Sequence, residues 1–276
     1  MNSFILDPIL RRALEEDIGT GDVTTLATIE PGTQASAELV AKEDFVLSGI
    51  DVAQRVFQLL SAETAFEKLI TDGQTVKRGD VIAWIKGDAA VLLQGERVAL
   101  NLLQRMCGVA TLTSAFVREV ADTRAVVVDT RKTTPGLRVL EKYSVRMGGG
   151  GNHRMALYDA VLIKENHVAA AGGITAAVSR AKQRVPHTQK IEVEVRNQEE
   201  VAEALAAGAD ILLLDNMTLD ELTAAVELVG DQAITEASGG VNLETVRDIA
   251  ETGVRLISVG ALTHSYRAVD ISMLFA

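Results

Sequence analysis

The sequence is poor in several residue types, and each scarcity excludes a class of protein. It has a single cysteine, Cys107, in 276 residues. One cysteine forms no disulfide within the chain, and no cluster of metal ligands surrounds it, so we expect a small buried hydrophobic residue there. Aromatic residues make up only 4% of the chain. The core must therefore be mainly aliphatic, which suits helices packed on buried parallel strands.

Positive charge and long apolar runs are also scarce. The chain has 27 Lys and Arg against 38 Asp and Glu, a formal net charge of −11, and this argues against general nucleic-acid binding, which needs a positive surface. No run approaches the roughly 20 apolar residues that cross a membrane, and residues 1–12 do not read as a secretory signal. We expect a cytoplasmic protein without nucleic-acid or membrane partners.

What is present falls into two parts with different patterns. Up to about residue 124 the chain reads as mixed helices and short strands, with helices expected over 7–18 and from about 92 to 120. Beyond it, aliphatic runs alternate with helical patterns, which predicts right-handed βαβ units and a parallel sheet. The runs are 125–128, 160–163, 191–193, 211–214, 233–235 and 256–259.

The repeated strand–helix unit favours an α/β barrel of the TIM type with fewer than eight strands. An open, doubly wound sheet is the alternative. Such a sheet concentrates its site at one switch point, whereas polar residues follow nearly every run of this sequence. The barrel is therefore the better interpretation of the second part.

The residues just after the runs are the candidates for a site, because barrel strands present their carboxyl ends on the active-site face. Cations follow the first two runs, carboxylates the next two, and glycine-rich turns the last two. They are Thr130-Arg131-Lys132, Lys164, Glu194, Asp215, Ser238-Gly239-Gly240 and Gly260-Ala261. One polar residue after a strand is usually a helix cap, but six successive ends of this kind predict a site.

The charges of these residues indicate an anionic ligand. Four glycines before Asn152 cannot hold a stable helix, so we expect a loop that brings His153 and Arg154 to the barrel mouth. Arginine binds carboxylates and phosphates bidentately, and lysine supplies a compact charge. Together with the cations after the first two runs, this loop predicts a polyanion site in an acidic protein.

The carboxylates and the glycine-rich turns have their own chemistry. Glu194 and Asp215 could hold Mg²⁺ or sugar hydroxyls, since hard cations prefer oxygen ligands, or could pair with the nearby cations. Glycine turns that lead towards helices offer backbone N–H groups to a phosphate, although either turn alone could be a plain tight turn. Two of them after adjacent late strands favour phosphate binding.

Several segments around these positions are specific enough to indicate a family. They are Thr130-Arg131-Lys132-Thr133-Thr134-Pro135-Gly136-Leu137-Arg138, Asn152-His153-Arg154, Ile163-Lys164-Glu165-Asn166-His167, Leu213-Leu214-Asp215-Asn216-Met217, Glu236-Ala237-Ser238-Gly239-Gly240 and Val259-Gly260-Ala261-Leu262-Thr263-His264. Over nearly its whole length the chain resembles the quinolinate phosphoribosyltransferases. The resemblance implies that it joins quinolinate to phosphoribosyl pyrophosphate and releases CO2 and pyrophosphate, a step of NAD biosynthesis.

The resemblance also implies an architecture and a set of roles. An N-terminal α/β sandwich would occupy 1–110 and the barrel 111–276, with the last residues able to pack back on the first domain, and the chain would form at least a homodimer. Quinolinate would contact Arg97 of the partner, Thr130, Arg131, His153, Arg154 and Lys164. The phosphoribosyl pyrophosphate would contact Lys132, Glu194, Asp215, Ser238, Gly239, Gly240, Gly260 and Ala261. Lys132, Glu194 and Asp215 would be catalytic, and the two carboxylates would hold Mg²⁺ directly or through water.

Three other functions stay open at this point. A related phosphoribosyltransferase could act on another acid, such as nicotinate. A Schiff-base lyase could use Lys164, which ends a strand as an imine-forming lysine would. A phosphate-binding barrel without chemistry is the third, against which the presence of Lys132, Glu194 and Asp215 argues.

Overall fold

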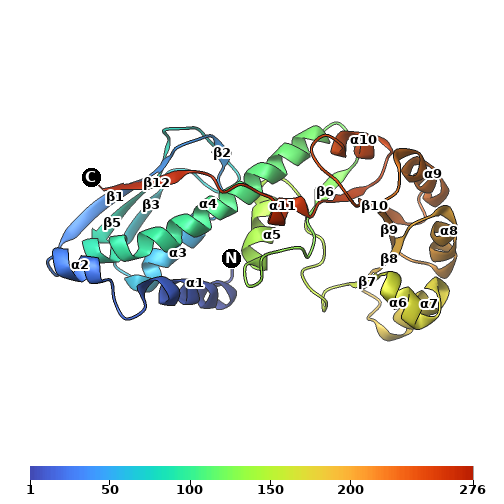
Figure 1. Cartoon of the computed structure of the whole chain (residues 1–276), viewed down its shortest axis with the longest axis horizontal. Coiled ribbons are helices and arrows are strands. Elements are labelled where there is room, and N and C mark those ends of the chain that lie inside the picture. Colours follow the sequence, from blue (N-terminus) through green and yellow to red (C-terminus); the bar gives the residue numbers. More distant parts are fainter. Residues whose placement is uncertain (276) are drawn as a thin grey trace. The chain divides into compact units, whose positions relative to one another are not determined.

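The computed structural model describes residues 1–275 and divides into two compact units (Figure 1). The first unit comprises residues 1–112, 134–149 and the end of the chain from residue 266, and the second comprises 113–133 and 150–265. The long helix α4 (Ala89–Glu119) begins in the first unit and ends in the second. Whether 1–110 and 111–276 act as separate domains stays a prediction.

The first unit is built on a four-stranded antiparallel sheet with the order β12-β1-β5-β3. Its strands are β1 (Gln34–Ala41), β3 (Ala65–Lys68), β5 (Val81–Asp88) and β12 (Ile271–Phe275), and a separate pair joins β2 (Phe45–Val46) to β4 (Thr75–Val76). The last strand of the chain thus pairs with the first strand, with Leu39 opposite Met273. This pairing between the two ends of the chain completes the sheet.

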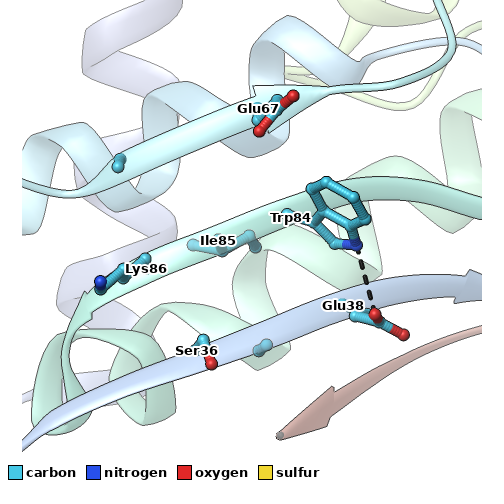
Figure 2. A pocket seen from close by; sticks show the side chains of 8 residues that line it. Ser36, Glu38, Glu67, Trp84, Ile85 and Lys86 are labelled. Carbon is cyan, nitrogen blue, oxygen red and sulfur yellow. Dashed lines mark hydrogen bonds between the residues drawn. The ribbon is translucent and has the colours of Figure 1, made fainter.

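Alternation along the strands decides which face of this sheet is covered. Ala37, Leu39 and Ala41 of β1 are buried, and they share one core with the helices of this unit. Those helices are α1 (Ser3–Ile18), α3 (Ile50–Leu60), the first part of α4 and α5 (Arg138–Met147), and the short helix α2 (Val23–Thr28) lies outside this core with Val23 and Leu26 exposed. Figure 2 shows the opposite face, where the exposed Trp84 donates a hydrogen bond from Nε1 to Glu38 Oε1 at 3.2 Å.

The first helix starts earlier than its apolar spacing indicates. The sequence predicts a helix over 7–18, whereas α1 begins at Ser3. Asn2 explains the difference, because its side chain accepts a hydrogen bond from Phe4 N at 2.9 Å and so caps the helix. The helix ends where expected, at Ile18, before Gly19 with φ of 52°.

The second unit contains six parallel strands in the order β6-β11-β10-β9-β8-β7. They are β6 (Val126–Val128), β7 (Val161–Ile163), β8 (Ile191–Val195), β9 (Ile211–Asp215), β10 (Ile234–Ser238) and β11 (Leu256–Ser258). Five of them are neighbours in chain order, and the order never reverses, which excludes the doubly wound alternative. The expected fold class is confirmed: an α/β chain whose barrel-like sheet has fewer than eight strands.

Helices cover the outside of this sheet, as Figure 1 shows for α7, α8 and α9 beyond β8 and β9. They are α6 (Glu165–Ala171), α7 (Ile174–Arg184), α8 (Gln198–Ala207), α9 (Leu219–Val229), α10 (Val246–Glu251) and α11 (Ala261–His264). The aliphatic runs lie between these helices and the barrel interior; Leu212 and Leu214 of β9, for example, are fully buried. Within residues 1–275, no helix is long and apolar enough to cross a membrane.

The packing of α4 in the first unit depends on a glycine. A Cβ atom at Gly95 would lie 2.8 Å from two carbons of the Phe57 ring, and Phe57 is fully buried on α3. We expect Gly95→Ala to lower the free energy of unfolding of this unit by about 1–3 kcal/mol, because the buried ring cannot move without strain. Urea denaturation followed by the fluorescence of Trp84, the only tryptophan in the sequence, measures this unit.

Gly87→Ala is the matched control for this change. A Cβ atom there would meet its nearest neighbours, atoms of Thr64, at 3.4 to 3.6 Å, so it should not destabilise the unit. An unfolding midpoint of Gly95→Ala equal to that of the unchanged protein would contradict the packing described here.

Candidate active site

The carboxyl ends of the parallel strands surround a cavity of about 670 Å³, a size typical of small-molecule sites. Its lining includes every expected site residue of the second unit: Thr130, Arg131, Lys132, His153, Arg154, Lys164, Glu194, Asp215, Ser238, Gly239, Gly240, Gly260 and Ala261. It also includes Leu162, Leu213, Glu236, Val241, Ser258 and His264, to which the sequence assigned no role. The structure therefore brings residues from all six strand ends to one place.

Several of these residues belong to the strands themselves and not to the loops after them. Glu194, Asp215 and Ser238 were expected to follow their strands, but β8, β9 and β10 extend through them. The backbone hydrogen bonds between the strands continue through these residues because strand pairing does not depend on an apolar side chain. Ser238, for example, lies opposite Asp215 in register. These side chains are consequently held on rigid elements.

Arg131, Lys132, Arg154 and Lys164 give the cavity its positive charge. Arg154 donates from Nη1 to Ala160 O at 2.9 Å, while its buried Nε has no hydrogen-bond partner among the described residues. Burial lowers the pKa of Arg154, and the charge of Arg131 lowers it further. Two guanidinium groups close enough to repel each other, one with a buried donor unused, suit an anionic ligand.

The loop before Arg154 is fastened to the end of β6. Gly151 N donates to Val127 O at 2.8 Å, so the chain runs beside the strand there. Asp129, which is fully buried, accepts from His153 N at 2.9 Å and from Asn152 Nδ2 at 2.6 Å. The glycine-rich segment thus reaches the cavity as expected, and Asp129 sets where His153 lies.

The His153 ring lies between two buried carboxylates that sequence reasoning missed. Its Nε2 is 3.0 Å from Glu192 Oε2 and 3.7 Å from Glu236 Oε1, and its Nδ1 accepts from Arg154 N at 2.7 Å. Burial, followed by the charge of Glu192, raises the pKa of Glu236 to about 7. A sequence signal existed: each carboxylate is two residues before a predicted site residue, Glu194 or Ser238, and alternate strand residues share a face.

Glu194 and Asp215 both reach the cavity. Glu194 accepts from Lys164 Nζ at 2.5 Å, and Asp215 accepts from Asn216 Nδ2 at 2.8 Å. The expected alternative, an ion pair with a nearby cation, therefore exists for Glu194. Over residues 1–275, these two carboxylates join no group of three His, Cys, Asp or Glu with ligand atoms within 4.8 Å, whereas His153, Glu192 and Glu236 do.

The two glycine-rich turns differ from the prediction in one respect. The turn at Gly239-Gly240 does not open a helix, because α10 begins only at Val246. Asn242 lies between the turn and the helix, and its side chain accepts hydrogen bonds from the backbone N–H groups of Glu244 and Thr245. The turn at Gly260 leads directly into α11, and a Cβ atom there would meet Lys132 Cδ at 2.9 Å. This glycine lets Lys132 lie against the turn.

Arg97 is the one expected site residue that the structure does not place in the cavity. It lies on α4 in the first unit, its side chain is 58% exposed, and its nearest acidic partner is Glu96 at 3.9 Å. Its expected role belonged to a neighbouring subunit, so its place in a site stays a prediction.

Comparisons with known proteins agree with this geometry. The family description "Quinolinate phosphoribosyl transferase, N-terminal domain" matches residues 22–107, and the corresponding C-terminal domain matches 109–274. The chain belongs to the quinolinate phosphoribosyltransferase family. It is 46% identical over 274 residues to a Bacillus subtilis protein named as a probable nicotinate-nucleotide pyrophosphorylase (carboxylating), covering 99% of this chain and 94% of the relative.

Another relative and a solved structure give the same result. A Synechocystis protein of the same name is also 46% identical, covering 98% of this chain and 92% of the relative. The solved nicotinate-nucleotide pyrophosphorylase of Francisella tularensis superposes with a TM-score of 0.96 at 38% identity, covering 100% of this chain and 98% of that one. The family resemblance expected from the sequence is confirmed over both units.

The fastening of the His153 loop can be tested at Asp129. Asparagine at this position would offer one oxygen and one NH2 group to two converging donors, so one donor would face another in either orientation. We expect Asp129→Asn to weaken the attachment of residues 152–154 by about 1–3 kcal/mol. Amide hydrogen exchange of this segment, followed by mass spectrometry, should become faster.

Asp231→Asn makes the same chemical change at an exposed turn of the second unit and should leave the exchange of 152–154 unchanged. Equal protection of the segment in Asp129→Asn and the unchanged protein would show that Asp129 does not hold this loop.

Proposed function

We propose that this chain transfers the phosphoribosyl group of phosphoribosyl pyrophosphate to the ring nitrogen of quinolinate, with release of pyrophosphate and CO2. The observation that carries the proposal is the cationic cavity of the second unit, which gathers the family's residues in a chain similar over 99% of its length to a protein named as a carboxylating nicotinate-nucleotide pyrophosphorylase. The product would be nicotinate mononucleotide, a precursor of NAD.

Quinolinate has two adjacent carboxylates, and fixed cations offset their repulsion and loss of hydration. Arg131, Arg154 and Lys164 line the cavity and would bind them, with Thr130 as a further donor. The buried Nε of Arg154 has no hydrogen-bond partner among the described residues, which supports the role of Arg154 in binding a carboxylate of quinolinate. His153 would line the quinolinate pocket through its ring face, since its nitrogens face Arg154 N and Glu192.

Lys132, Glu194 and Asp215 would act on the sugar and its leaving group. Ribosyl transfer develops positive charge at the sugar carbon, which the carboxylates of Glu194 and Asp215 would stabilise. Lys132 would stabilise the departing pyrophosphate, helped by backbone groups of the two turns, Ser238-Gly239-Gly240 and Gly260-Ala261. Positioning and electrostatics would supply most of the rate, and no covalent nucleophile is needed.

The same two carboxylates fit a magnesium ion. They supply hard oxygen donors on the cavity wall, and Mg²⁺ is commonly held by one or two carboxylates together with substrate phosphates and water. Glu194 and Asp215 would hold the ion directly or through water. When bound, it would neutralise charge on the pyrophosphate.

Decarboxylation follows from the first step. Once the ring nitrogen carries the ribosyl group it is cationic. It then stabilises the electron pair that stays on the adjacent ring carbon when the carboxylate of that carbon leaves as CO2. The alternative of a Schiff-base lyase is disfavoured by Lys164, which donates to Glu194, whereas imine formation needs a free neutral amine. A related acid as substrate remains the second candidate, because the cavity cations would also bind a single carboxylate.

One turnover assay tests the proposal. With quinolinate, phosphoribosyl pyrophosphate and Mg²⁺, we expect nicotinate mononucleotide and CO2 in equal amounts, because transfer and decarboxylation occur in the same site. Arg131→Ala should weaken quinolinate binding by about 1.5–3 kcal/mol, the usual size of a hydrogen bond to a charged group. Nicotinate mononucleotide formed from nicotinate and not from quinolinate would refute the proposal.

We propose that the chain works as a homodimer in which Arg97 completes the cavity of the neighbouring subunit. Large apolar side chains are exposed on both units, which supports an interface. They are Phe4, Ile5, Val23 and Leu26 on the first unit and Leu157 and Tyr158 on the second, with Phe4 90% and Tyr158 78% exposed. Some plant relatives are named as mitochondrial or chloroplastic, so the cytoplasmic location stays a prediction.

Sharing of the site can be tested by mixing two inactive variants. Arg97→Ala and Lys164→Ala chains should each be inactive alone, whereas a mixed dimer would combine one intact Lys164 cavity with one intact Arg97. We expect partial recovery of nicotinate mononucleotide formation after subunit exchange. No recovery in mixed dimers verified by native mass spectrometry would argue against a shared site.

A further inference from the structure

His153, Glu192 and Glu236 form a group at the wall of the cavity, which His153 and Glu236 line. The proposed mechanism does not use the two carboxylates of this group. Glu192 is 4% exposed and Glu236 is 2% exposed, and an Oε1 atom of each has no hydrogen-bond partner among the described residues. Buried carboxylate oxygens without hydrogen-bond partners are costly, so this arrangement calls for a role.

The hydrogen bonds of the His153 ring exclude a metal role for this group. Because Nδ1 accepts from Arg154 N, it carries no proton, and the neutral ring must carry its proton on Nε2. That N–H points at Glu192 Oε2. A metal ion would need the Nε2 lone pair instead, so the group is arranged to hold protons.

The same geometry assigns the charges of the two carboxylates. Glu192 Oε2 lies 3.0 Å from Nε2 and accepts the Nε2–H hydrogen bond, while the nearest atom of Glu236 is 3.7 Å from that nitrogen. Around Glu236 lie Glu192 on β8, Asp129 after β6, the His153 ring, and Ser258 on β11, whose hydroxyl donates to Ala237 O at 3.3 Å. Burial and the two neighbouring carboxylates raise the pKa of Glu236, and Glu236 lacks the His153 hydrogen bond that Glu192 accepts, so Glu236 is the group that takes up a proton.

We propose that Glu236 is the acid that protonates the ring carbon from which CO2 departs, an inference that rests on the proposed function. The bond between that carbon and its carboxylate breaks, CO2 leaves, and the electron pair stays on the carbon next to the cationic nitrogen. The carbon then forms a C–H bond with the Glu236 proton while the O–H bond breaks. The Glu236 carboxylate regains a proton from water.

Three observations favour Glu236 over Arg131, Arg154 and Lys164 as this acid. Arginine does not give up a proton in proteins, which excludes Arg131 and Arg154. The ammonium of Lys164 is engaged by Glu194. Glu236 lines the cavity, and its pKa, raised to about 7, is close to the operating pH at which general acids work best. A neutral Glu236 also avoids repelling a dianionic substrate.

The test is a single-turnover experiment on Glu236→Gln. Glutamine keeps the size and the neutral charge of the protonated acid but cannot give up a proton. We expect quinolinate binding to change by less than about threefold, while nicotinate mononucleotide formation falls by about 100-fold or more, the usual contribution of a general acid. Pyrophosphate release should run ahead of nicotinate mononucleotide, because the ribosylated intermediate still forms and then accumulates.

The pH profile gives a second readout that a structural role would not move. The acid must be protonated to act, so wild-type product formation should be level below about pH 7 and fall as pH rises beyond it. Glu236→Asp should retain part of the rate and of this falling limb, and Glu236→Gln should lose the limb. Glu227→Gln, an exposed carboxyl of the same unit, should keep the wild-type rate and profile.

Each outcome decides the matter. The proposal would be overturned if the rates of pyrophosphate release and of nicotinate mononucleotide formation fell together in Glu236→Gln, or if both stayed at the wild-type values. It would also be overturned if the decrease in rate above about pH 7 persisted in this variant. Wild-type protein that makes no nicotinate mononucleotide from quinolinate would instead refute the proposed function, so the two failures are distinguishable.

Discussion

The order of the parallel strands is the constraint on which the rest of the site depends. Because five strands are neighbours in chain order and β6 joins β11, all six carboxyl ends meet at one rim. Residues as distant in the chain as Thr130 and His264 therefore line one cavity. The aliphatic strand residues supply the burial that holds the sheet, and this leaves the strand ends free to carry charged groups that contribute little to folding.

Much of this arrangement follows from local patterns in the sequence. The alternation of aliphatic runs with helical segments predicts the sheet of the second unit, and the position of Lys164, Glu194 and Asp215 at the run ends predicts the rim. Pairing between distant segments is not visible in such patterns. Nothing in residues 271–275 indicates that β12 pairs with β1, because a short strand of this kind could join any free edge. Arg97 likewise has no local signal, and only the family resemblance points to it.

The buried residues of the site are harder to predict from the sequence than the residues at the strand ends. Glu192 lies within a run that otherwise reads as a buried strand, and Glu236 precedes an expected turn, so neither stands where a strand visibly ends. Both are nonetheless interior, since each is two residues before a rim residue on the same face. An acidic residue at an interior position of a barrel strand is costly unless it is paired or neutral, and that cost is itself a sequence signal of function.

Charge in this cavity is arranged by depth as well as by sign. The cations nearest the expected ligand carboxylates lie on the loops, where burial and the charge of Arg131 lower the pKa of Arg154. An entering dianion relieves the repulsion between these two guanidinium groups. Deeper in, Glu192 and Asp129 would repel the same ligand if Glu236 were also charged, and protonation of Glu236 limits the negative field at the cavity floor. The net charge of −11 therefore says little about ligand choice, because Arg131, Lys132, Arg154 and Lys164 line the cavity of this acidic chain.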